Sequence, residues 1–600
     1  MQDEGINVPS PELQMLRLNK ESGYNYRQRR HQDWLENYTL YRDKVTVNRL
    51  TQRQSVNLPL MKQTIQTRLK DVDDMPVIYF ENLDNDKDAE IFQNEYWKYT
   101  ISPQCNNMEV KDVIDKKQEM LFGRTFDQMQ IVDGKILITI EDPQDILVDR
   151  FTDPADIDTA RFLIHQHIFR PLSALANNPD YDQEAIKRMQ EFYATQQGIM
   201  KAADNLGAME EKNRKLAELG VPDIENPVVG ETYVELSLHF VFRESDTYVN
   251  EDGETVTVED QYMLFVECDD MEILMKKPVE VIIGKTSDNY WRKHLPYNSW
   301  AEDVERQDFW SDGVGDVVRT PNKILNVWFS QLIENRTLRS FGMHYYNNAL
   351  EGFTPPNIDP EPWGWVGVPI PDGKNINDVF QKVDIPDLSE SLDEMEFVIG
   401  MNDRASGATA TQQGVPSARQ ITLGEVKLAL TEAQKFNQGM SKFYTIAWQK
   451  RAEKFLKMIE AAPDKLDAVE IYKEGRNTSN IYKREIAPKD WMTKSGYRVK
   501  IWNQNERDQQ QQQQFEKLTA VVNLIPGNTK LQDIVQRKAL EWADVSPDDV
   551  NEILKLEQEK RDALANNPNP MGLPPGAPTP SGTPGAPVPQ PPAPIMPAGQ

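Results

Sequence analysis

The sequence contains little cysteine, little histidine and no long hydrophobic run. Only two cysteines, Cys105 and Cys268, occur in 600 residues, which excludes a disulfide framework and indicates a reducing compartment. No apolar run approaches the roughly 18 residues that span a bilayer, and the first residues lack the apolar core of a secretory signal. We therefore expect neither a secreted protein nor an integral membrane protein, and no membrane partner.

Positive charge is also scarce. The chain has 67 Lys and Arg residues against 95 Asp and Glu residues, a net charge of −28. A protein that coats DNA needs a basic surface, so the chain is a poor candidate for this class, although a local basic element can still contact nucleic acid. Hydrophobic residues make up 39% of the chain and charged residues 27%. This balance is typical of folded domains, and the length allows about four of them.

Signatures of catalysis are missing as well. The sequence has no serine-nucleophile elbow, no protein-kinase motif and no zinc-hydrolase motif. The segment VEVIIGKTS over 279–287 ends in Gly284-Lys285-Thr286 like a phosphate-binding loop, but Val279 stands where that loop requires glycine. A polar turn after a strand is the better interpretation. We expect no catalytic residues and no enzyme activity.

Two segments resemble metal sites. The acidic segment 84–95 has the spacing of a calcium loop, but Ala89 replaces the required glycine, and an acidic helix N-terminus explains the same residues. His165 and His167 are two apart on an expected strand and point to one face. They have the chemistry of zinc ligands, but no third ligand is evident. We expect no metal and no cofactor.

The first half of the chain alternates strand and helix patterns, which predicts an α+β fold. Residues 11–70 read as helix, interrupted near Pro59. Asp133-Gly134, between two alternating segments, is the strongest hairpin signal in the chain. The other strand predictions cover 75–80, 160–170, 231–243, 261–268 and 272–283, and the polar segment 171–222 reads as a helical insertion.

The second half has a different order of elements. Two helices flank an irregular segment rich in proline and aromatic residues, and a small, polar, flexible stretch separates the second helix from a long third helix. The predicted ranges are 315–340, 341–385, 386–402, 405–418 and 417–460, followed by helical sequence over 505–564 and a disordered Pro-rich tail over 565–600. The long helix carries a heptad-like stripe with Phe436, Met440 and Phe443, which we expect in the core.

This order of elements resembles the portal proteins of tailed double-stranded DNA bacteriophages. EDPQDILVDRFTDPADIDTARFLIHQHIFR (141–170) is similar to an Asp-Pro-rich portal segment in which Ala-Arg-aromatic leads into a strand. WAEDVERQDFWSDGVGDVVRTPNKILNVWFSQLIEN (300–335) is similar to the lead into the first stem helix of that family. NDRASGATATQQGVPSARQITLGEVKLALTEAQ (402–434) is similar to its flexible loop and the helix that follows. The resemblance covers most of residues 10–560.

The resemblance implies the portal fold, an α+β fold that assembles as a ring. Its parts are called wing, stem helices, clip, tunnel loop and crown. On this sequence they map to 1–314 (wing), 315–340 (first stem helix), 341–385 (clip), 386–402 (second stem helix), 403–420 (tunnel loop), 421–504 (long helix and remaining wing) and 505–564 (helical crown), before the disordered tail at 565–600. The insertion at 171–222 has no counterpart in the family pattern.

The resemblance also implies a function. Portal subunits form a ring, usually of twelve, at one capsid vertex, where the ring is the conduit for double-stranded DNA during packaging and ejection. The implied protein is a virion component assembled in the host cytoplasm. Its partners are its own copies, the major capsid protein, the terminase motor, head–tail adaptor or tail proteins and the DNA in the channel. An acidic ring suits this function, because strong phosphate neutralisation would hold the duplex tightly.

The implied tunnel loop supplies the candidate DNA-channel residues. Arg404 and Arg419 are the main candidates, and Lys427 is a further one. The alternative is that these cations are solvated surface charges or pair between subunits. Gly407 and Gly414 give the backbone freedom that a loop needs to shift as DNA passes, although the same freedom suits any surface loop.

Two further clusters remain open. Trp363 and Trp365 in the implied clip are candidates for contacts with neighbouring subunits or adaptors, and a small local core beneath the turns is the alternative. The cluster Arg27, Arg29 and Arg30 is interpreted either as a DNA-facing or capsid-facing patch or, preferably, as a helix surface with ordinary ion pairs.

Another class of virion protein competes with the portal interpretation. A scaffold or minor head protein without a DNA channel would also suit long helices, acidity and a disordered tail. The order of helix, irregular module, helix, flexible loop and long helix favours the portal interpretation, because a scaffold does not need it. An enzyme of the packaging apparatus would require a complete phosphate loop or a metal-binding carboxylate cluster.

Overall fold

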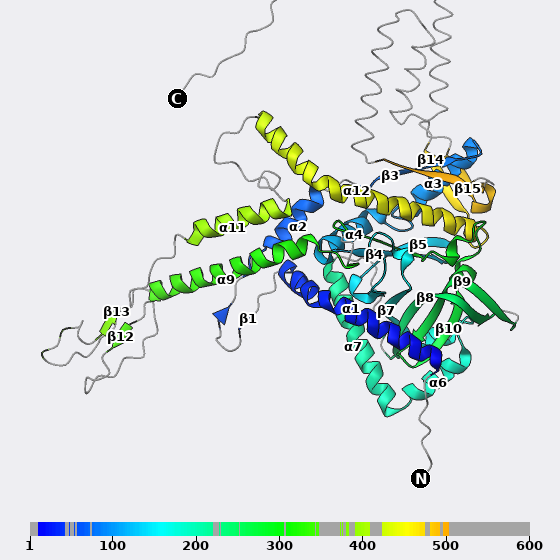
Figure 1. Ribbon diagram of the computed structural model, residues 1–600, viewed down its shortest axis with the longest axis horizontal. Coiled ribbons are helices and arrows are strands. Elements are labelled where there is room, and N and C mark those ends of the chain that lie inside the picture. Colours follow the sequence, from blue (N-terminus) through cyan, green and yellow to red (C-terminus); the bar gives the residue numbers. More distant parts are fainter. Residues whose placement is uncertain are drawn as a thin grey trace, which may run out of the picture. The chain divides into compact units, whose positions relative to one another are not determined.

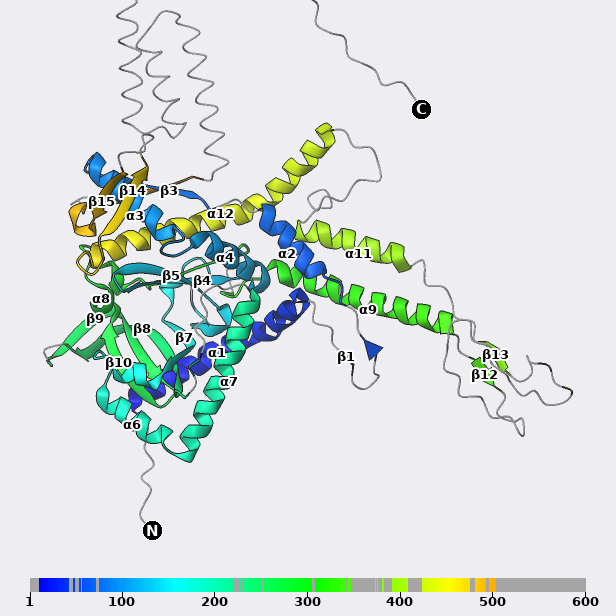
Figure 2. The ribbon, with the colours of Figure 1, turned by 180° about the vertical axis from the view of Figure 1, so that it is seen from behind.

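The chain is a mixed α+β protein with antiparallel sheets, seen from two sides in Figures 1 and 2. The computed structural model describes residues 10–42, 47–48, 53–54, 57–71, 75–219, 227–228, 230–250, 253–304, 308–341, 344–346, 373, 375, 380–382, 391–407, 423–474, 481–492 and 496–502. The predicted helical segment 505–564 and the predicted tail 565–600 lie outside the described residues. No helix among the described residues is long and apolar enough to cross a membrane.

The chain begins with a long helix, α1 (Pro11–Tyr41), as its sequence predicts. The Ser10 side chain accepts a hydrogen bond from the Leu13 N–H at 3.2 Å, and Pro11 occupies the first turn, where its missing N–H costs nothing. A two-residue strand pair, β1 (Val47–Asn48) with β2 (Arg53–Gln54), follows. Helix α2 (Leu60–Asp71) starts directly after Pro59, in agreement with the predicted interruption, but the helix expected up to Pro59 is wrong over β1 and β2, because α1 already ends at Tyr41.

The largest sheet has five antiparallel strands in the order β10-β9-β8-β7-β6. Their bounds are Ile146–Val148 (β6), Phe162–Pro171 (β7), Tyr233–Val249 (β8), Thr255–Cys268 (β9) and Glu272–Pro278 (β10). The strand predicted over 272–283 is wrong in its last part. Pro278 ends β10, and Val279–Ile283 form the short helix α8, because proline cannot continue the ladder of N–H donors.

A three-stranded sheet in the order β11-β4-β5 contains the predicted hairpin. Its strands are Thr125–Val132 (β4), Lys135–Glu141 (β5) and Tyr297–Trp300 (β11). Asp133 and Gly134 join β4 to β5 with φ angles of +48° and +73°. Two successive positive φ values are what a two-residue hairpin turn requires, and Asp-Gly adopts them readily. The hairpin prediction is confirmed.

Helices and smaller strand pairs surround these sheets. Helix α3 (Lys87–Ile101) is capped by Asp86, whose side chain accepts hydrogen bonds from two backbone N–H groups at 3.1 Å, and helix α4 (Met108–Phe122) ends at Gly123 with φ +78°. The paired strands are Val77–Asn82 (β3) with Tyr497–Trp502 (β16), and Val469–Glu474 (β14) with Ile481–Ile486 (β15). Single turns occur at Pro143–Asp145, Ile157–Thr159, Tyr290–Arg292 and Pro488–Asp490.

The polar insertion is helical, as predicted. It contains α5 (Leu172–Ala176), α6 (Gln183–Tyr193) and α7 (Gln196–Leu219) between β7 and β8. Polar contacts fix α7 to the body. Lys212 Nζ lies 2.7 Å from Asp145 Oδ2, and Lys215 Nζ lies 2.6 Å from Asp142 Oδ2. The insertion therefore packs on the α+β body and belongs to it.

The second half supplies three long or medium helices. They are α9 (Val314–Phe341), α11 (Ser391–Ser406) and α12 (Leu423–Ala461), with the short strands β12 (His344–Tyr346) and β13 (Phe380–Lys382) between α9 and α11. The helix expected over 386–402 is displaced toward the C-terminus. Acidic Asp393 and Glu394 occupy its first turn, which favours a helix start there, and Gly407 follows its end with φ +74°.

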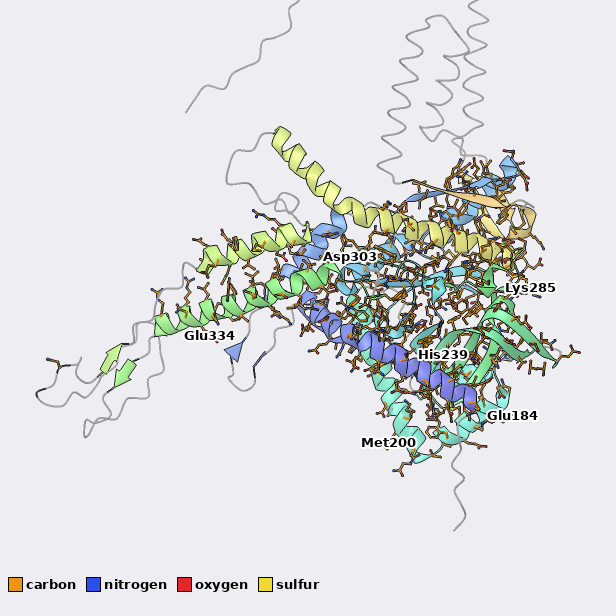
Figure 3. The ribbon with its side chains drawn as sticks, in the orientation of Figure 1. Glu184, Met200, His239, Lys285, Asp303 and Glu334 are labelled. Atoms are coloured by element: carbon orange, nitrogen blue, oxygen red, sulfur yellow. The ribbon has the colours of Figure 1, made fainter. Side chains whose placement is uncertain are left out.

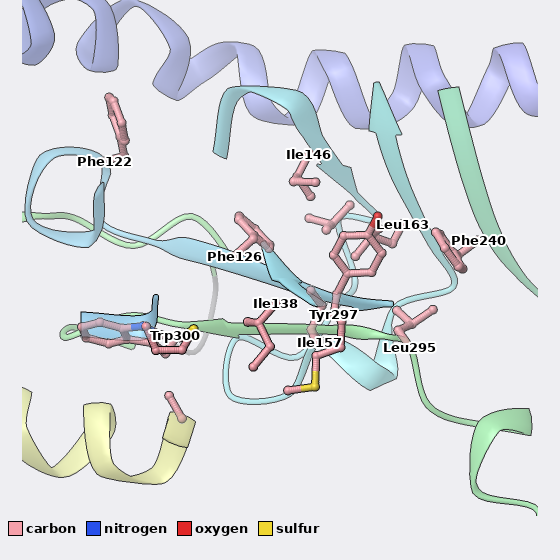
Figure 4. Packing of buried hydrophobic residues seen from close by; sticks show 14 of the residues in the cluster. Phe122, Phe126, Ile138, Ile146, Ile157, Leu163, Phe240, Leu295, Tyr297 and Trp300 are labelled. Atoms are coloured by element: carbon pink, nitrogen blue, oxygen red, sulfur yellow. The ribbon is translucent and has the colours of Figure 1, made fainter. Parts of the chain in front are cut away.

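The main core lies between the three-stranded sheet, the five-stranded sheet and the helices that cover them. Figure 4 shows Phe126 and Ile138 of the smaller sheet, Leu163 and Phe240 of the larger one, and Tyr297 close together. All five side chains are buried. A second cluster of buried apolar side chains, which includes Leu16, joins α1 to the larger sheet. One side chain departs from prediction: Phe443, expected in the core, is 39% exposed.

Candidate functional site

The helices α9 and α11 form an antiparallel pair. Both views show them side by side, starting from the region of α1, α2 and α4. At the other end of the pair, β12 and β13 join in antiparallel register, with His344 opposite Lys382 and Tyr346 opposite Phe380. Figure 3 marks Glu334 on α9 and Asp303 near the start of that helix. The chain thus leaves one helix and returns to the other through a paired-strand neck.

One face of α9 is apolar and exposed. Val317, Ile324 and Val327 are 43%, 38% and 54% exposed, and their spacing of seven and then three residues places them on one side of the helix. Val318 and Leu325 on another side are buried. The exposed positions Thr320 and Gln331 continue the first stripe at heptad spacing, without a charge.

Helix α11 also exposes large apolar side chains. Phe397 and Met401, one turn apart, are 68% and 54% exposed, whereas Met395 is buried. Clusters of large exposed apolar groups mark interaction surfaces of proteins. We call Val317, Ile324, Val327, Phe397 and Met401 together the apolar surface of the helix pair.

The base of the pair is held by buried polar contacts. Arg68 of α2 donates from Nη1 to the Ser406 carbonyl oxygen at 2.8 Å and pairs through Nη2 with Glu302 at 2.6 Å. One turn away on both helices, the Asn402 side chain donates to Thr64 Oγ1 at 3.3 Å. No motif in the sequence marks these residues: each of the two hydrogen bonds joins positions 338 apart, and the Arg68–Glu302 ion pair joins positions 234 apart.

The long helix α12 is anchored by cations. Arg451 Nη2 lies 3.1 Å from Asp115 Oδ2 and 2.8 Å from Asp127 Oδ1, with all three side chains buried. Burial by itself lowers the pKa of Arg451, but the two aspartates outweigh it and raise that pKa above its ordinary value. Lys454 adds a 3.0 Å contact with Asp158. The C-terminal half of α12 is therefore fixed to the body.

Of the candidate DNA-channel residues, the structure describes Arg404 and Gly407 at the end of α11 and the backbone of Lys427 in α12. Arg404 is an exposed residue of the last turn of α11, and Gly407 is the glycine that directly follows that helix. Lys427 belongs to α12, but its side chain lies outside the description. Gly414, Arg419 and the clip candidates Trp363 and Trp365 lie outside the described residues.

A charged cleft of about 1010 Å³ lies among α1, α7 and the β7 region. His167 Nδ1 lies 2.8 Å from Asp145 Oδ1, and Lys212 contacts the other oxygen of that carboxylate. Burial by itself raises the pKa of Asp145, but Lys212 and His167 outweigh it and hold the pKa well below its ordinary value. These carboxylates and cations satisfy one another, so they form structural ion pairs.

The two histidines contact different polar groups: His165 lies beside Tyr297 and Glu141, and His167 beside Asp145. A bulge between His165 and Ile168 breaks the strand alternation, and His167 has φ +59°. His165 is buried beside Tyr297, at 3.0 Å between Nδ1 and the hydroxyl oxygen, and burial lowers the pKa of His165. Among the described residues, no three His, Cys, Asp or Glu side chains are grouped to hold a metal ion.

The phosphate-loop and basic-cluster segments have structural roles. The residues before Gly284 form helix α8, not the strand that a phosphate loop needs, and a Cβ at Gly284 would overlap the Ala461 carbonyl. Arg30 lies 2.6 Å from Asp312 and from Asp316, and buried Arg27 donates to the carbonyl oxygen of Gln144. Both arginines support the ion-pair and packing interpretation of their cluster.

No protein-family model matches the sequence, and a search of curated proteins found no match.

Proposed function

We propose that the chain is a portal protein of a tailed double-stranded DNA bacteriophage. Its copies form a ring at one capsid vertex, and double-stranded DNA passes through the ring during packaging and ejection. The terminase motor and later the head–tail adaptors bind at the end of the helix pair that carries β12 and β13.

The observation that carries the proposal is the antiparallel pair α9–α11 with its strand-paired neck and its apolar surface. An isolated subunit would leave Ile324, Val327 and Phe397 against water. Burial of apolar area is worth about 25 cal/mol per Å², so contact with a second copy is favourable. Exposed large apolar groups at helical spacing fit helix-to-helix contacts between neighbours.

The position of Arg404 is compatible with a conduit. The residue is exposed in the last turn of α11, at the start of the segment 403–420 that resembles the tunnel loop. An acidic ring with only a small number of cations can contact the DNA phosphates weakly. It avoids the tight and strongly salt-dependent binding that many cations produce. The acidity of the chain, a net charge of −28, supports a surface over which DNA slides.

The test is negative-stain electron microscopy of the purified full-length chain, together with its mass in solution. Rings with a central hole near the width of a duplex are the expected result. A monomer at high concentration, or an elongated scaffold-like assembly without a hole, would contradict the proposal.

A double variant and a control test whether the apolar surface holds the ring together. Ile324→Asp with Val327→Asp places two carboxylates in the contact and should abolish the rings while the circular dichroism spectrum stays unchanged. Met200→Asp is the matched control, because Met200 is 66% exposed on α7, away from the helix pair. Equal loss of rings in both variants would show that added charge, and not the apolar surface, matters.

A further inference from the structure

We propose that Arg68 is a positioning residue that clamps the C-terminal end of α11 and so fixes the direction in which the chain leaves that helix at Gly407. The clamp is built from α2, α11 and the Glu302 segment. It deepens the proposed function, because Arg404 lies in the clamped turn, but its contacts exist within a single subunit.

Arg68 supplies a hydrogen-bond donor to a backbone carbonyl oxygen at the C-terminal end of α11. The last four carbonyl oxygens of a helix have no partner within it, and a cation near that end is favoured by the helix dipole. The Ser406 carbonyl oxygen receives the Arg68 Nη1–H group at 2.8 Å. Both residues are buried, with relative exposures of 3% and 2%, so this hydrogen bond is made away from water.

Two contacts of equal spacing define the orientation of α11 on α2. Thr64 and Arg68 are one turn apart on α2, and Asn402 and Ser406 are one turn apart on α11. A helix held at two successive turns cannot rotate about its own axis without breaking both contacts. The exposed side chain of Arg404, between these two turns, is oriented by the same contacts.

The Arg68 guanidinium also contacts a segment outside α2 and α11. Glu302 Oε1 lies 2.6 Å from Arg68 Nη2, and the Glu302 N–H donates to Glu119 Oε1 of α4 at 2.7 Å. A buried ion pair contributes little net stability compared with apolar side chains of similar volume. A planar guanidinium does supply fixed directions, one to a carboxylate and one to a carbonyl, and fixed directions are what positioning requires.

Hydrogen exchange of the full chain tests the clamp. In Arg68→Met, peptides that cover the last two turns of α11 should exchange about 10- to 100-fold faster, the factor expected when a hydrogen bond to a charged group is lost. Peptides of β8 should exchange at the wild-type rate. Arg188→Met is the matched control, because Arg188 pairs with Glu272 at 2.9 Å on an exposed surface.

Two further variants separate positioning from folding. Arg68→Lys keeps the positive charge on a single donor nitrogen and should restore part of the protection, and Glu302→Gln should loosen α11 less than Arg68→Met does. Unchanged exchange at α11 in Arg68→Met would overturn the proposal. Faster exchange throughout the chain in Arg68→Met, without recovery in Arg68→Lys, would also overturn it, because Arg68 would then be only a folding residue. A failure of ring assembly in the wild type contradicts the proposed function and leaves these exchange rates unaffected.

Discussion

Glu119 of α4 is a carboxyl group without exposure to solvent. Its Oε1 accepts the Glu302 N–H, and its Oε2 has no hydrogen-bond partner among the described residues. Burial, and then the neighbouring Glu302, raise the pKa of Glu119 from 4.5 to about 8. Arg68 acts in the opposite direction, and Asp115 adds to the increase. The folded protein therefore holds this proton more tightly than the unfolded chain does.

The sign of the pH dependence follows from that difference. The stability that the protonated Glu119 provides is fully present below pH 4.5 and is lost as the pH rises through about 8. Glu119→Gln stays neutral, so its free energy of unfolding should decline less between pH 5 and 8. Urea unfolding at several pH values measures this, with exposed Glu109→Gln on the same helix as control. A wild-type-minus-variant difference that is constant with pH would contradict the prediction.

At the scale of elements, Gly284 is the position at which the end of helix α8 packs against the end of helix α12. Its φ is +135°, and an added Cβ would overlap the Ala461 carbonyl. Gly284→Ala should lower the free energy of unfolding by about 1–3 kcal/mol, from strain and overpacking. Gly207→Ala is the control: Gly207 lies in α7 with open space around it, and alanine there should stabilise by about 0.5–1 kcal/mol. Chemical denaturation measures both, and equal effects would contradict the packing role of Gly284.

The elements that the sequence predicts best are those with local signals. Asp133 and Gly134 readily adopt the positive φ angles that their hairpin turn requires. The Ser10 side chain caps the start of α1, and Pro11 fits its first turn. The helix predicted over 315–340 is observed as Val314–Phe341. The segment after Pro278 is different, because its apolar residues fit a strand or a buried helix equally well and tertiary contacts decide between them.

The candidate site is less predictable, because its contacts join distant parts of the chain. Arg68 and Ser406 are 338 positions apart, and so are Thr64 and Asn402. Arg404 and Gly407 attract attention through their residue types, yet nothing local indicates that a buried guanidinium orients their helix. Phe443 shows the converse error: an apolar residue on a heptad-like stripe is placed in the core by periodicity, although its neighbours leave it 39% exposed.

At the scale of the whole molecule, charge and apolar contact oppose each other. Each copy of the chain carries a net charge of −28, so copies repel one another over the screening length of the solvent. The five side chains that define the apolar surface of the helix pair are themselves uncharged. In the proposed ring, this surface supplies the attraction, and the remainder of each copy supplies the repulsion.

Salt should therefore promote assembly. The screening length falls from about 30 Å at 0.01 M ionic strength to about 8 Å at 0.15 M, which weakens the repulsion between copies and leaves apolar contact in place. The fraction of the full-length chain found in rings by sedimentation velocity should rise between these two conditions. The Ile324→Asp, Val327→Asp variant should remain monomeric in both. Rings that dissociate as salt is added would contradict this balance of forces and would show that ion pairs between subunits hold the assembly together.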